Sequence, residues 1–68
     1  MKISYDSDAD AMYIELRDDE VDHTKELDEN TIIDYNKKNQ VIGVELLFVK
    51  ERNPDLLKKF QVENLTPA

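Results

Sequence analysis

Apolar and polar side chains alternate in two short stretches near the start of the chain, and this pattern restricts the fold more than any other feature. Residues 1–5 and 11–16 both show it. A period of two places successive side chains on opposite faces of a β-strand. We therefore predict a strand over each stretch, joined as a hairpin through the Asp- and Ser-rich turn at residues 6–10.

Later stretches favour strands by residue type. Residues 31–35 are β-branched and aromatic, and residues 41–49 are apolar apart from Gly43 and Glu45. The first composition is typical of strands, and the second is typical of a strand buried on both faces. The polar residues 36–40 predict a turn between them.

Gly43 and Glu45 are unusual within so apolar a strand. A glycine inside a strand marks a β-bulge or the close approach of another backbone or an aromatic ring, and of these we expect the bulge. We expect Glu45 on the outer face. A buried Glu45 would need a partner, such as the hydroxyl of Tyr13 or Tyr35.

Two segments complete the predicted architecture. Residues 17–30 are acidic and predict a connection, within which the alternation at 23–27 fits a short additional strand. Asn53, Pro54 and Asp55 predict the start of a helix, because asparagine caps helices, proline suits the first turn and an acid favours the positive end of the helix dipole.

These elements predict an α+β fold. Its sheet is an antiparallel β-meander of four strands, or five if residues 23–27 form one, followed by one short C-terminal helix. We expect one small domain over residues 1–68. The sheet occupies residues 1–49, the helix region residues 50–61 and a tail residues 62–68.

The small size of the chain favours association. A domain of 68 residues buries about 60% of its unfolded surface, and domains of this size often depend on disulfides, metals or a second subunit. The chain has no cysteine, which excludes a disulfide framework and thiolate chemistry. We predict a homo-oligomer or a protein partner. The lack of a signal peptide and of a long apolar run favours a cytoplasmic protein without a membrane span.

Charge is distributed unevenly along the chain, whose net charge is −7. Residues 6–29 hold eleven acidic and two basic side chains, whereas residues 37–68 hold four acidic and six basic ones. An acidic field disfavours nucleic acids, because binding to phosphates requires clustered lysine and arginine. A basic protein suits this surface better.

Three aspartates at alternate positions, Asp6, Asp8 and Asp10, resemble the opening of a calcium-binding loop. The full loop requires glycine at its sixth position and glutamate at its twelfth, where this chain has Ala11 and Arg17. A solvated turn is the simpler interpretation. Weak binding of divalent cations by this turn is the alternative function.

The chain shows no pattern that predicts catalysis or a cofactor. Its serine and threonine residues are scattered along the chain, and a single histidine is present to act as a base for them. Its single glycine excludes a glycine-rich phosphate loop. We predict a non-enzymatic protein-interaction module. The candidate contact residues are aromatic or aliphatic: Tyr13, Tyr35, Leu47, Phe48, Leu56 and Phe60.

Three motifs resemble the small prokaryotic proteins catalogued as domain of unknown function 2283. They are Tyr5-Asp6 followed by residues 10–14, then Ile33-Asp34-Tyr35, then residues 41–46. The resemblance covers residues 1–49 and implies a compact antiparallel sheet without an assigned activity. It also suggests an antitoxin-like role toward a small basic partner. Lys38-Asn39 stands where the family pattern often has Asp-Gly, and the chain departs from the pattern after Glu45.

Overall fold

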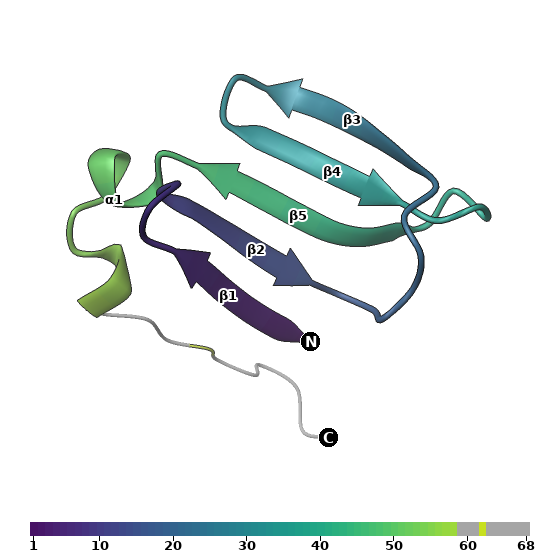
Figure 1. Ribbon diagram of the computed structural model, residues 1–68, viewed down its shortest axis with the longest axis horizontal. Helices are drawn as coiled ribbons and strands as arrows, with labels where there is room; N and C mark the ends of the chain where they lie inside the picture. Colours follow the sequence, from purple (N-terminus) through teal and green to yellow (C-terminus); the bar gives the residue numbers. More distant parts are fainter. Residues whose placement is uncertain (59–61, 63–68) are drawn as a thin grey trace.

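The computed structural model describes residues 1–58 and 62, and contains a five-stranded antiparallel sheet followed by two short helical segments (Figure 1). The elements in chain order are β1 (Lys2–Asp6), β2 (Ala11–Glu15), β3 (His23–Asp28), β4 (Thr31–Tyr35), β5 (Val41–Leu47), α1 (Val49–Arg52) and the 3₁₀ helix η1 (Leu56–Lys58). The α+β prediction with a short C-terminal helix is therefore consistent with the structure, and the sheet has five strands rather than four.

The strand order is β1-β2-β5-β4-β3, so the predicted meander is wrong. β1–β2 forms a hairpin and β3–β4–β5 forms a meander. The two parts join into one sheet because β5 pairs antiparallel with β2. Residues 16–22 carry the chain from β2 to the far edge of the sheet (Figure 1). The most apolar segment thereby occupies the centre, where it has a neighbour on each side.

The predicted strands agree with the observed ones to within one or two residues at each end. β4 and the turn at residues 36–40 match their predicted bounds. The fifth strand lies at His23–Asp28, where every residue is exposed. Because β3 is an edge strand with little apolar surface, its sequence pattern was weak.

The helix start predicted at Asn53 is wrong. α1 begins at Val49, and Asn53 is its C-terminal cap, whose amide N–H donates to the carbonyl oxygen of Val49 at 2.9 Å. Phe48 ends the strand earlier than predicted because its backbone is left-handed, with φ 54°. Leu56 begins the separate 3₁₀ helix η1, and its amide N–H donates to the carbonyl oxygen of Asn53 at 3.0 Å. Phe60 and the predicted tail, apart from Val62, lie outside the described residues.

The sheet forms a single layer in the described part of the chain. Figure 1 shows α1 and η1 beside one end of the sheet rather than over a face. The hydrophobic side chains that are almost completely buried are Met12, Ile42 and Val49, with exposed fractions of 5%, 1% and 3%. Most apolar side chains of the sheet, by contrast, are half-buried. No helix in the described residues has the length and apolar character needed to cross a membrane.

Candidate functional site

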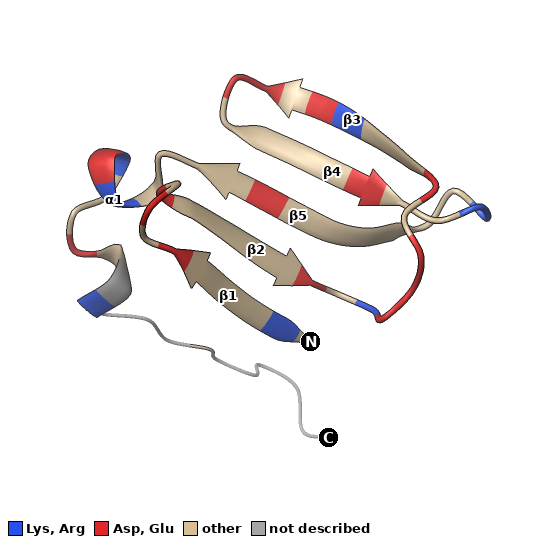
Figure 2. Ribbon diagram, in the orientation of Figure 1, with Lys and Arg blue, Asp and Glu red and all other residues tan. Residues whose placement is uncertain are grey.

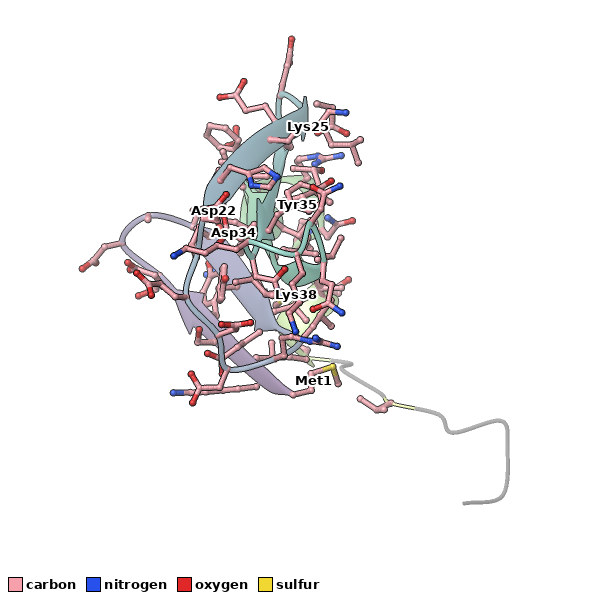
Figure 3. The ribbon with its side chains drawn as sticks, turned by 90° about the vertical axis from the view of Figure 1, so that its right-hand side faces the viewer. Met1, Asp22, Lys25, Asp34, Tyr35 and Lys38 are labelled. Carbon is pink, nitrogen blue, oxygen red and sulfur yellow. The ribbon has the colours of Figure 1, made fainter. Side chains whose placement is uncertain are left out.

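The two faces of the sheet differ in chemistry because side chains alternate along each strand. On one face, residues directly opposite one another form a row across four strands, which we call the apolar row: Ile3, Ile14, Val44 and Ile33. Lys25 of β3 lies opposite Ile33 and ends this row. Figure 3 views the sheet from its side and shows Lys25 and Tyr35 on one side and Asp34 on the other.

The opposite face, which we call the acidic face, receives one carboxylate from each strand. Figure 2 shows acidic residues on all five strands and along the β2–β3 connection. By register, the carboxylates that share this face are Asp6, Glu15, Glu26, Asp34 and Glu45. Lys2 of the edge strand β1 is the one basic strand residue on the acidic face, and it lies opposite Glu15.

Tyr13 lies across the acidic face and over Gly43. Its hydroxyl donates to Asp34 Oδ2 at 2.8 Å. A Cβ at Gly43 would overlap the Tyr13 hydroxyl and ring, so the glycine leaves the space that the ring occupies. Burial, followed by the hydrogen bond to Asp34, raises the pKa of Tyr13 to about 12. Asp34 is fully engaged, because Thr24 Oγ1 donates to its other oxygen at 2.9 Å.

The group that approaches Gly43 closely is therefore the Tyr13 ring. An aromatic ring was one alternative to a β-bulge in the sequence-based prediction. A bulge is also present nearby. The β4–β5 register shifts between Asp34, which lies opposite Gly43, and Tyr35, which lies opposite Val41. The irregular residue of β5 is thus Ile42, one position before the glycine. A glycine in one strand beside a tyrosine in the next was the sequence signal for this arrangement, but Asp34 as the hydroxyl acceptor was missed.

Glu45 lies half-buried in the middle of β5, between Tyr13 of β2 and Ile32 of β4. It faces outward, as expected. The Tyr13 hydroxyl binds Asp34 rather than Glu45. The single ion pair recorded among the described residues joins Asp22 and His23, so Glu45 has no cationic partner there. A carboxylate bordered by an aromatic and an aliphatic side chain therefore faces away from the sheet.

Asp10 connects the first hairpin to α1. Its backbone is left-handed, with φ 51°. Its carboxylate accepts hydrogen bonds from the Tyr5 hydroxyl at 2.7 Å, the Lys50 amide at 2.8 Å and the Glu51 amide at 3.1 Å. The carbonyl oxygen of Asp10 also accepts from the Val49 amide at 3.1 Å. These bonds, with the Tyr5 bond first, lower the pKa of Asp10.

The predicted cation site gains no support from this geometry. Asp6 Oδ1 accepts hydrogen bonds from the amides of Asp8 and Ala9, at 3.0 and 3.3 Å, which makes it a turn-forming residue. Asp10 faces α1 instead. Across the described residues, no group of three or more acidic, histidine or cysteine side chains is placed to hold a metal ion.

A hollow of about 370 Å³ lies where the β2–β3 connection passes the β4–β5 turn, and Asn36 organises it. Asn36 is 4% exposed and donates to Asp19 Oδ2 and to Gln40 Oε1, both at 2.9 Å. Its own oxygen accepts from the amides of Lys38 and Gln40. Sequence reasoning missed this residue, because an asparagine in a polar turn gives no sign of a partner 17 positions away.

The predicted contact residues do not form one surface. Leu47 lies with Tyr13 on the acidic face, whereas Tyr35 lies on the opposite face, where its ring stacks on His23 with centroids 4.9 Å apart. Phe48 and Leu56 belong to the helical end of the molecule and are 48% and 37% exposed. Which of them contact a partner remains a prediction.

The comparisons with known proteins identify a family but no activity. The family model described as Protein of unknown function (DUF2283) matches residues 2–50. This range contains all five strands, Tyr13, Gly43 and Asp34. No curated protein and no solved structure matches the chain.

Proposed function

The chain belongs to the family Protein of unknown function (DUF2283), and on that premise we propose that it is a non-enzymatic protein-interaction module whose acidic face binds an arginine- or lysine-rich partner protein. The observation that carries this proposal is Glu45. It is a half-buried carboxylate at the centre of the sheet without a cationic partner among the described residues.

A basic side chain complements the surroundings of Glu45. An arginine can pair with the carboxylate while its planar guanidinium packs against neighbouring aromatic and aliphatic side chains, which Tyr13 and Ile32 supply. Glu26 lies opposite Ile32 on the same face and extends the negative surface toward the edge of the sheet. The net charge of −7 would accelerate the approach of a basic partner.

The internal hydrogen bonds favour binding over catalysis. Tyr13, Asp34 and Asp10, which belong to the family motifs, all direct their polar atoms at other groups of the chain. These residues hold the sheet and α1 in place, and leave no nucleophile beside a free base among them. Neutralisation of a small basic protein, as an antitoxin does, is the form of this role that the family resemblance suggests.

The proposal is tested by purifying the chain with its partner from its native cells and then measuring the affinity of the isolated partner by calorimetry. We expect the double variant Glu26→Gln/Glu45→Gln to weaken binding at least tenfold. The matched variant Glu29→Gln/Glu51→Gln removes the same charge from a turn and from α1, and should bind like the wild type. Higher salt should weaken the wild-type complex.

The proposal fails if the acidic-face variant binds its partner as tightly as the wild type. It also fails if the partner that copurifies is acidic, because its surface would then repel the acidic face.

A further inference from the structure

Within residues 1–58, the apolar face of the sheet is not covered by the second layer of secondary structure that a stable domain requires. Sheets bury an apolar face against another layer of secondary structure. Here α1 and η1 lie beside the sheet, and the four aliphatic side chains of the apolar row are half-buried (Figure 1). Met12, on the same face, is almost completely buried. We propose that a second copy of the chain packs on this face, with the apolar rows of the two copies in contact.

Charge identifies the second copy as the occupant. A chain with net charge −7 repels its own copies wherever two acidic surfaces meet. The apolar face carries few carboxylates, because one from each strand lies on the other side of the sheet. By register, the strand carboxylate on the apolar side is Asp28 of the edge strand β3, which lies opposite Thr31. Lys25 is the charged side chain that ends the apolar row, on the edge strand, where it can remain in water. Two copies can therefore bring their apolar rows together without opposing acids.

The size of the face matches a small dimer interface. Five strands about 4.8 Å apart cover roughly 24 Å, and five to seven residues at about 3.4 Å cover roughly 20 Å. The flat outline is then about 480 Å² per copy, or about 960 Å² for two, before side-chain relief is added. Specific interfaces begin at about 1,000 Å². We expect a dimer that forms at micromolar concentration and dissociates on dilution.

Symmetry places β5 at the centre of this dimer. A face-to-face pair related by a two-fold axis through the middle of the interface stacks the central strand of one copy on that of the other. Val44 is the middle residue of Val41–Leu47 and belongs to the apolar row. It therefore lies near the axis and faces its own counterpart in the partner.

Sedimentation velocity of the full chain, from about 2 to 500 µM, tests the proposal. We expect the mass to rise from 8.0 kDa toward twice that value. Ile33→Glu places a carboxylate in the apolar row but opposite Lys25 of the same copy, and should remain a folded monomer throughout. Ile32→Lys is the matched control. It introduces a charge on the same strand, opposite Glu45 on the acidic face, and should dimerise normally.

A cross-linking experiment does not depend on the folding of a charged variant. Because the chain has no cysteine, Val44→Cys introduces a unique thiol that a short bis-maleimide should link into covalent dimers. Ile32→Cys should link far less. Equal cross-linking of the two, or a wild type that stays monomeric at every concentration, overturns the proposal.

A chain shortened after Lys58 tests another occupant, the chain's own C-terminal residues. We expect the shortened chain to dimerise like the full one. If the full chain is instead monomeric and shortening it makes it dimeric, residues 59–68 cover the face and the proposal is wrong. These outcomes are separate from those of the proposed function, which concerns the opposite face.

Discussion

Replacing Gly43 by alanine should destabilise the protein through Tyr13 alone. Gly43 does not adopt a positive φ, so the backbone at this position accepts any residue. The added methyl group would overlap the Tyr13 hydroxyl and ring and force the ring away from Asp34. Overpacking of this kind costs about 1–3 kcal/mol, and the lost hydrogen bond about 1 kcal/mol. Alanine restores about 0.5–1 kcal/mol by restricting the unfolded chain. The net loss in the free energy of unfolding is about 1–3 kcal/mol.

A double-mutant cycle separates this cause from a general effect of alanine. With Tyr13→Ala already present, Gly43→Ala meets no ring and should stabilise the protein by about 0.5–1 kcal/mol. The two substitutions should therefore couple by about 2–4 kcal/mol, which is the sum of the overpacking and hydrogen-bond costs. Urea denaturation followed by circular dichroism, at one fixed protein concentration, measures all four free energies. If Gly43→Ala costs as much without the tyrosine ring as with it, the reasoning is refuted.

Three further predictions concern titration and the buried amide. The folded pKa of Tyr13, about 12, exceeds the unfolded value of about 10, so the stability that Tyr13 contributes should fall as pH rises from about 10 to 12. Ultraviolet titration of wild type and Tyr13→Phe checks this, and an unchanged absorbance change near pH 12 in the variant contradicts it. The folded pKa of Asp10 is lowered, so the stability that Asp10 contributes is present above the unfolded pKa of about 4 and is lost as pH falls below it. Urea denaturation between pH 6 and 3 should show that the free energy of unfolding falls less steeply for Asp10→Asn than for the wild type. Parallel pH dependences for the two proteins would exclude the effect. Asn36→Ala should lower the free energy of unfolding by about 2–4 kcal/mol, because it leaves backbone amides and the Asp19 carboxylate without their partner. Urea denaturation measures this loss, with Lys37→Ala at an exposed neighbouring position as the control. Equal losses for the two variants would contradict the role of Asn36.

The sequence patterns located β1, β2, β4 and β5 well because these strands are short and rich in apolar or β-branched residues. Residues 31–35 and 41–47 are examples, since β-branched and apolar residues dominate both. β3 gave a weak pattern because all of its side chains are exposed. Local sequence patterns could not predict the strand order, because β5 pairs with β2 across an interval of some 30 residues.

The helix was misplaced for a different physical reason. Asn53 and Pro54 are good starting residues, but Asp10 supplies acceptors for the Lys50 and Glu51 amides from 40 positions earlier and so begins α1 sooner. A separation of 21 positions likewise concealed Asp34 as the acceptor for Tyr13. Residue types at these positions indicated turns and strands, but their partners became visible only in the folded chain.

The position of β5 between β2 and β4 also determines when the sheet can be completed. The β1–β2 hairpin is made first during synthesis, yet its inner edge pairs with a strand that ends at Leu47. An isolated hairpin is marginally stable in water. The hairpin must therefore wait for almost the whole described chain, and closing such a long loop slows folding. The β2–β5 pairing therefore joins the strands that are furthest apart along the chain among neighbours in the sheet, and two copies that exchanged their β1–β2 hairpins would form this pairing between chains.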